Sequence, residues 1–203
     1  MFDRLLSRFA RRRPPVERST PRPYRPDTLL AACGLLLPDD PSLAAEVHLA
    51  IAHPDAYPAR FGARLAGRTV PPVAGADLAW IALLDALEAR GRLAVVDWDD
   101  PPEFVMEAVD HLLRDWPPDP ARWAWVPAPP AGADPDDDPR HAGEFLPAVG
   151  TRLLPHGLVL ATFDLDADQY AFAVLDAGPF PTLRALVAAA GFKLEPFTQD
   201  SPM

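Results

Sequence analysis

The sequence predicts an α+β domain with a four-stranded, mainly antiparallel sheet in the β-α-β-β-α-β order of ferredoxin-like folds, preceded by additional N-terminal helices. Three observations lead to this prediction. Apolar runs at 158–163 and 170–175, joined by a polar turn, are typical of a β-hairpin. Apolar residues recur at helical spacing before and after this hairpin. A short apolar run at 93–96 and the segment 192–197 supply the two remaining strands.

The first elements are expected to be helices near 28–37 and 41–53, followed by a clearer helix at 76–90. In the third helix, apolar residues from Trp80 onward recur every three or four positions. Gly91 follows, and glycine ends helices because it adopts the left-handed backbone conformation without steric cost.

The strand at 93–96 leads into an acidic turn and then into a fourth helix with apolar residues on one face through Trp116. Asp100 and Glu103 flank two prolines, a pattern that predicts a capping box at the start of this helix. Three tryptophans, Trp80, Trp98 and Trp116, are expected to pack in the core where these elements meet.

A Pro- and Asp-rich stretch at 117–141 interrupts the pattern, and we interpret it as a long surface loop. The residues that follow it, 148–154, are expected to be helical up to the hairpin. A helix at 183–190 comes after the hairpin, and the last strand, 192–197, contains a proline, which is tolerated at a sheet edge.

Charge divides the chain into two parts. Residues 1–26 hold eight arginines and two acids, whereas 27–203 hold 11 basic and 27 acidic residues. We therefore predict a basic amphipathic tail with a Pro/Arg-rich linker over 1–26, and a single α+β domain over 27–203.

The single cysteine, Cys33, lies among leucines and is expected to behave as a small buried hydrophobe with a raised thiol pKa. The first residues lack the apolar stretch of a secretory signal, and no run is long enough to span a membrane. These features predict a cytoplasmic protein.

Two blocks of sequence, 80–98 and 154–170, resemble a bacterial family known only as a domain of unknown function. The blocks include Trp80-Ile81-Ala82-Leu83-Leu84 and Leu154-Pro155-His156-Gly157-Leu158, and the resemblance covers roughly 76–197. It implies a stand-alone cytoplasmic bacterial domain and carries no catalytic residues.

Aspartates gather at two predicted turns. Carboxylate oxygens are the ligands that Mg²⁺ and Ca²⁺ prefer, so a metal site is one hypothesis. Turn and cap formation is the alternative, because short acidic side chains bond nearby backbone amides. From sequence, the two groups can lie at the same end of the sheet or at opposite ends. The weak metal candidates are Asp97, Asp99, Asp164, Asp166 and Asp168.

The acidic body favours association with a basic protein and repels nucleic acid. The alternative is that the acidic charge only keeps the protein soluble. Aromatic residues on an exposed loop are frequent binding anchors, although both tryptophans of the 117–141 loop can instead fold back over the sheet. The predicted partner-binding residues are Trp123, Trp125, Asp134, Asp136, Asp137 and Asp138.

The N-terminal segment 1–13 has apolar residues at helical spacing, with arginines elsewhere. Such a segment can lie on an anionic membrane surface or dock on an acidic partner. The residues predicted to take part are Phe2, Arg4, Leu5, Leu6, Arg8 and Phe9.

The sequence lacks H-E-x-x-H, G-x-S-x-G, P-loop and G-x-G-x-x-G motifs. We therefore expect a non-enzymatic protein-binding domain with no cofactor, for example an immunity or regulatory protein for a basic partner. A metal-dependent enzyme using the aspartates and a membrane-surface adaptor using the N-terminal segment are the alternatives.

Overall fold

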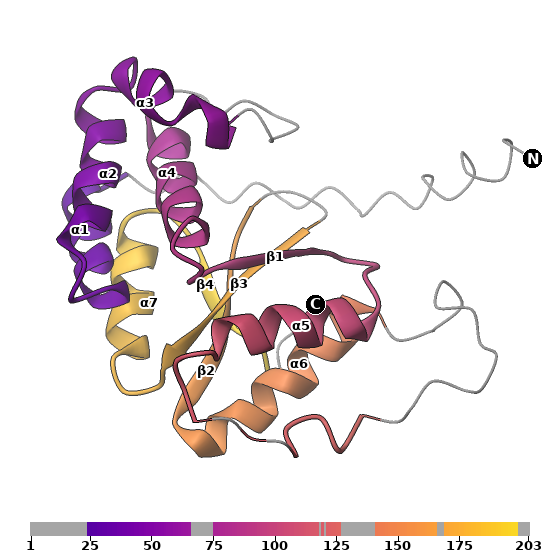
Figure 1. The fold of residues 1–203 in the computed structure, drawn as a ribbon. Helices are drawn as coiled ribbons and strands as arrows, with labels where there is room; N and C mark the ends of the chain where they lie inside the picture. The colour runs from indigo at the N-terminus through magenta and orange to yellow at the C-terminus, as the bar shows by residue number, and fades with distance from the viewer. Residues whose placement is uncertain are drawn as a thin grey trace, which may run out of the picture.

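The computed structural model describes residues 24–65, 75–117, 119, 121–126, 141–165 and 169–198 (Figure 1). Within these residues the chain forms helices and one four-stranded sheet. The elements in order are α1 (Pro26–Leu36), α2 (Pro41–Ala52), α3 (Ala56–Leu65), α4 (Ala76–Glu88), β1 (Ala94–Asp97), α5 (Pro102–Leu112), α6 (Ala142–Leu153), the 3-10 helix η3 (Leu154–His156), β2 (Leu158–Phe163), β3 (Gln169–Asp176), α7 (Phe180–Ala189) and β4 (Leu194–Pro196).

The predicted helices and strands are confirmed, with two differences. Helix α3 was not predicted, because it contains Pro58 and Gly62 and has a kink at Phe61. Helix α6 begins at Ala142, six residues before the predicted start, and continues through Pro147. In the described part of the chain, no helix is long and apolar enough to cross a membrane.

The sheet is antiparallel and has the order β1-β3-β2-β4, which does not confirm the ferredoxin-like arrangement. In a ferredoxin-like sheet the fourth strand pairs with the first. Here β4 pairs with β2 instead, and β1 and β4 form the two edges.

The position of β4 determines which faces of the sheet are covered. Helices α5 and α6 connect β1 to β2, and α7 connects β3 to β4. Both connections cross the sheet toward the edge formed by β4. They start from β1 and β3, which are antiparallel to each other. Since such crossovers are right-handed almost without exception, α7 lies on the opposite face from α5 and α6 (Figure 1). A ferredoxin-like order would have placed all three on one face.

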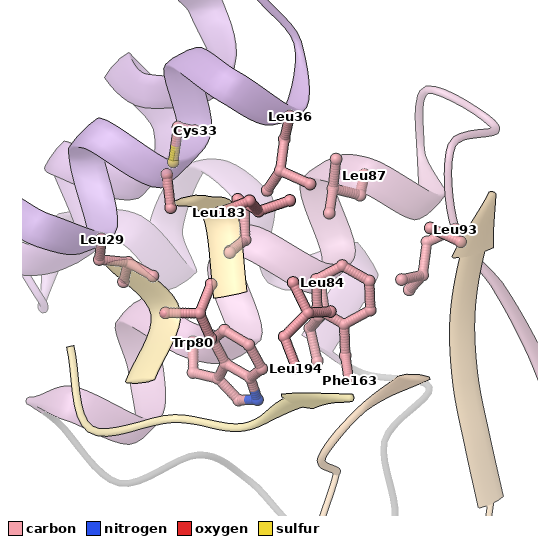
Figure 2. Close-up of a cluster of buried hydrophobic side chains, with 14 of the residues drawn as sticks. Leu29, Cys33, Leu36, Trp80, Leu84, Leu87, Leu93, Phe163, Leu183 and Leu194 are labelled. Atoms are coloured by element: carbon pink, nitrogen blue, oxygen red, sulfur yellow. The ribbon is translucent and has the colours of Figure 1, made fainter. Parts of the chain in front are cut away.

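The first face of the sheet packs against α1, α2, α4 and α7, with alternate strand residues such as Val159, Ala161 and Phe163 pointing toward these helices. Trp80 from α4 stacks on Phe192, with ring centroids 4.4 Å apart, and its indole N–H donates to the carbonyl of Asp164 at 2.7 Å. Figure 2 shows this side of the core, where Trp80, Leu183 and Leu194 converge with Cys33 nearby.

The second face packs against α5 and α6. Leu158, Leu160 and Phe172 point to this side and contact the buried residues of both helices, Val105, Val109, Phe145, Leu146 and Val149 among them. The side chains of β2 and β3 are buried on both faces of the sheet, so each strand has an uninterrupted apolar run in sequence.

Two predictions about the turn after β1 are wrong. Trp98 is not a core residue, since 52% of its surface is exposed. The N-cap of α5 is Pro101, and no side chain caps the helix. Asp100 instead accepts a hydrogen bond from the backbone N–H of Asp97 at 2.8 Å, which closes the turn at the end of the strand.

Burial of Cys33 predicts an unreactive thiol. The side chain is 1% exposed, and burial raises the pKa of Cys33 to about 12. At pH 8 only about one thiol in 10⁴ would then be the reactive thiolate. We expect no alkylation by iodoacetamide in the native protein and one equivalent in denaturant, as measured by mass spectrometry. Rapid stoichiometric labelling of the native chain would contradict the burial of this thiol.

Candidate functional site

The structure places the described aspartates at one end of the sheet. Asp97 pairs with Gln169 across β1 and β3, and Asp164 follows the end of β2. Strands in a sheet are about 4.8 Å apart, so Asp97 and Asp164, which are two strands apart, are separated by roughly 10 Å.

Each of these carboxylates already has a structural role or points to solvent. The side-chain amide of Gln169 donates to Asp97 at 2.9 Å, and the carboxylate of Asp164 lies 3.7 Å from the ammonium group of Lys193. Asp99 is exposed. Among the described residues, no three His, Cys, Asp or Glu side chains come together as metal ligands. Asp166 and Asp168 lie outside the described residues.

A groove of about 1060 Å³ lies at the other end of the α5/α6 layer. The end of α5, the turns at 121–126, the C-terminal part of α6 and η3 form its walls. Apolar and aromatic side chains dominate the lining, together with two arginines, one histidine and one aspartate. The aromatic and basic side chains of the lining are Trp116, Arg122, Trp123, Trp125, Arg152 and His156.

The two predicted loop tryptophans fold back onto α6 and form one wall of this groove. Trp125 stacks on Phe145 with centroids 5.3 Å apart, and the Arg152 guanidinium lies 4.3 Å from the Trp125 ring centre. Trp123 also stacks on Phe145, and its indole N–H donates to Asp110 at 2.9 Å. These contacts give both tryptophans a packing role, and their part in partner binding stays a prediction.

A different surface combines exposed aromatic rings with acids at the N-terminal end of α5. Phe104 is 57% exposed and Trp98 is 52% exposed. Phe104 and Glu107 are three residues apart on the helix and are therefore neighbours on its surface. We call this surface the acidic–aromatic face; its residues are Trp98, Asp99, Glu103, Phe104 and Glu107.

Residues 28–197 match the sequence profile of a family described as Domain of unknown function (DUF6630). The chain belongs to this family. The match begins within α1 and ends one residue after β4, so the DUF6630 domain includes the N-terminal helices as well as the sheet. No curated protein and no solved structure matches the chain.

Several predicted site residues of this DUF6630 member lie outside the described residues. They are the loop acids Asp134, Asp136, Asp137 and Asp138, and the N-terminal residues Phe2, Arg4, Leu5, Leu6, Arg8 and Phe9. Of the predicted partner-binding set, the structure therefore places only Trp123 and Trp125.

Sequence reasoning missed Phe104 and misplaced Trp98. A signal for Phe104 was present, because the buried stripe of α5 runs through Pro102, Val105, Val109 and Leu112, and position 104 lies off that stripe. An aromatic residue on the polar side of an amphipathic helix is a candidate binding residue in this DUF6630 domain.

Proposed function

We propose that this chain is a non-enzymatic protein-binding domain whose acidic–aromatic face takes a basic partner. The observation that carries the proposal is the exposure of Trp98 and Phe104 beside Asp99, Glu103 and Glu107. Large aromatic residues are enriched among the energetically dominant contacts of protein interfaces, and charged residues around them steer association.

The acids of this face have no basic partner among the residues that the structure describes. The ion pairs involve other acids, such as Asp110 with Arg122 and Asp115 with Arg92. Glu103 lies in the first turn of α5, where a negative charge stabilises the helix dipole. Glu107 lies one turn further along, beyond that effect. Trp98 contacts His141, with ring centroids 5.9 Å apart, but it stays more than half exposed, as does Phe104.

The charge of the whole domain supports the same type of partner. Residues 27–203 carry 11 basic and 27 acidic residues, so the body attracts cationic proteins and repels nucleic acid phosphates. A cationic toxin or nuclease that this domain neutralises is the concrete form of the proposal.

We expect a Trp98→Ala/Phe104→Ala double variant to bind a fluorescein-labelled basic peptide of Leu and Arg at least about tenfold more weakly than the unmodified chain, because truncating an energetically dominant interface residue costs about 2 kcal/mol or more. Fluorescence anisotropy at low and high salt measures the change. Binding of the unmodified chain should also weaken as salt screens the acids.

Leu35→Ala is the matched control, since Leu35 is an exposed apolar residue on α1, away from this face. It should leave peptide affinity unchanged. Equal binding of a Leu/Glu peptide, or an unchanged affinity in the double variant with a native circular dichroism spectrum, would contradict the proposal.

No observation favours the two alternatives over this one. The described aspartates make hydrogen bonds or ion pairs or face solvent without meeting a third ligand, so a metal-dependent enzyme gains no support from them. A membrane-surface adaptor would rest on residues 1–13, which lie outside the described residues.

A further inference from the structure

We propose that the acidic–aromatic face is the docking site of the chain's own N-terminal segment, residues 1–13, so that the tail and a basic partner compete for it. This inference rests on the proposed function, because both use the same surface. In this inference, the tail regulates binding by blocking the surface that a partner would use.

The N-terminal segment has the chemistry that this face would select. Its apolar residues fall at i, i+3, i+4 and i+7, a pattern that places them on one side of a helix. Five arginines and one aspartate make the segment strongly basic. The apolar residues are Phe2, Leu5, Leu6 and Phe9, and the arginines are Arg4, Arg8, Arg11, Arg12 and Arg13.

The face offers complementary groups for both properties. Trp98 and Phe104 provide apolar surface, each more than half exposed. Asp99, Glu103 and Glu107 provide carboxylates that make no ion pair within the described residues. Exposed apolar surface of this kind is costly in water unless something covers it, and the chain carries a matching segment.

The described chain begins at the correct end of the sheet for this contact. Tyr24 packs edge-on against Phe192, which stacks on Trp80, and Trp80 donates to the carbonyl of Asp164. Asp164 and Asp97 lie at the same end of the sheet, and Trp98 follows Asp97 directly.

The linker is long enough to span the remaining distance. Tyr24 lies one packed layer from the sheet on the α1/α7 side, and the face lies two strands across and one packed layer beyond the sheet on the other side, so each of these three steps is about 10 Å. Residues 14–23 are rich in proline and span about 30 Å when extended. The tail therefore reaches this face on its own molecule.

Because the tail is covalently linked to the domain, even a weak contact is enough to keep it bound to the face. A short linker gives the tail an effective concentration on the order of 1 mM at the face. A segment that binds with a dissociation constant near 0.1 mM would then occupy its own site about 90% of the time. A partner would have to be present in excess or bind more tightly to displace it.

Paramagnetic relaxation in the full chain tests the contact. A nitroxide is attached to a Ser7→Cys variant; it goes to this position alone because Cys33 is buried with a pKa of about 12. We expect the amide signals of residues 98–107 to lose more than half of their intensity. Signals of α7, on the opposite face, should keep theirs.

Three comparisons sharpen the test. Replacing the four apolar tail residues by serine should restore the signals and raise affinity for the Leu/Arg peptide several-fold. Glu103→Gln with Glu107→Gln should also restore the signals, whereas Asp176→Asn, at an exposed acid on β3, should not. In a mixture of spin-labelled chains without isotope and ¹⁵N-labelled chains without nitroxide, only contacts between two molecules broaden signals. Broadening in this mixture would assign the contact to a second copy and overturn the inference.

The outcomes separate this inference from the proposed function. If the four-serine variant binds the peptide no better than the unmodified chain and no broadening occurs, tail docking is wrong while the binding face stands. If no variant binds the peptide but broadening is present, the partner proposal is wrong and the tail is the ligand. Binding of the tail only to anionic vesicles of phosphatidylserine and phosphatidylcholine would overturn the inference.

Discussion

Replacing Gly150 with alanine is expected to destabilise the domain by roughly 3 kcal/mol or more. Gly150 lies in α6, and a Cβ at this position would sit 2.0 Å from the carbonyl oxygen of Phe197. That carbonyl belongs to the backbone, and the neighbouring N–H of Phe197 donates to Leu160 at 2.8 Å, which ties the segment to β2. Neither backbone can move without breaking contacts of the second core face.

Gly34→Ala is the matched control for this prediction. Gly34 also lies within a helix, α1, but its Cβ would meet nothing within 4 Å. Helix propensity alone predicts that both substitutions stabilise by about 0.5–1 kcal/mol. Urea unfolding should therefore show opposite signs for the two variants. A Gly150→Ala protein as stable as the unmodified chain would refute the close approach of α6 and β4.

Replacing Arg90 with methionine is expected to cost about 2 kcal/mol, because a half-buried acid would lose its main partner. The Arg90 guanidinium donates to Asp40 and to Glu46 at 2.6 Å each, and also to Ser42 at 2.7 Å. These bonds connect the end of α4 to α2. Glu46 is only 15% exposed and retains only Arg64 in the variant.

Arg184→Met is the control for the ion-pair prediction. Arg184 pairs with Glu195, but about half of each side chain is exposed, and exposed pairs contribute little. Urea unfolding at pH 7 should show a change within about 0.5 kcal/mol for Arg184→Met. Equal effects of the two substitutions would mean that the α2–α4 network contributes no more than a surface pair.

The same network makes stability depend on pH. Hydrogen bonds from Ser42 and then Arg90 lower the pKa of Asp40 to about 2. Burial acts to raise the pKa of Glu46, but its bonds to Arg90 and Arg64 lower it overall. Because both folded-state pKa values are depressed, this stabilisation is present above the ordinary pKa values near 4 and is lost as pH falls toward 2.

The stability gap between the unmodified chain and Arg90→Met should therefore narrow as pH falls from 5 to 3. Urea midpoints measured across this range give the gap directly, with Arg184→Met as the reference. A gap that stays constant or widens would show that the acids of the network are not ionised partners of Arg90.

Local sequence patterns were enough to predict most elements of the fold. The two strands of the β2–β3 hairpin begin and end within one residue of their predicted bounds. Polar residues on either side of an apolar run mark where a buried strand begins and ends. Gly91 and Gly191 do adopt positive φ angles at helix ends, as their positions predicted. Helix α3 was missed because its one deeply buried residue, Tyr57, leaves no long apolar stripe to detect.

The strand order required tertiary information, although one sequence signal pointed toward it. The runs 158–163 and 170–175 are apolar at nearly every position, which is typical of strands buried on both faces. In a ferredoxin-like sheet all crossover helices lie on one side, so the N-terminal helices alone would have to cover the other face. Placing β4 beside β2 adds α7 to α1, α2 and α4 on that face.

The candidate site was predicted only in part. Trp123 and Trp125 were correctly identified as loop aromatics, but their stacking on Phe145 depends on where α6 lies, and α6 is separate from them in sequence. Trp98 was misplaced because a residue at a strand end points inward or outward according to the turn that follows. The bond from Asp97 to Asp100 decides that turn.

The sequence by itself determined the family, the division into a basic tail and an acidic domain, and the identity of most helices and strands. These follow from composition and from periodicities of two and 3.6 residues, which are local properties. Only the tertiary structure decided the β1-β3-β2-β4 order, the exposure of Trp98 and the joining of Arg90 to α2. The strand order comes from covering both sheet faces at once, and the Arg90 bonds join segments more than 40 residues apart, so neither is a local property. The direction of Trp98 depends on the turn that the bond between Asp97 and Asp100 closes.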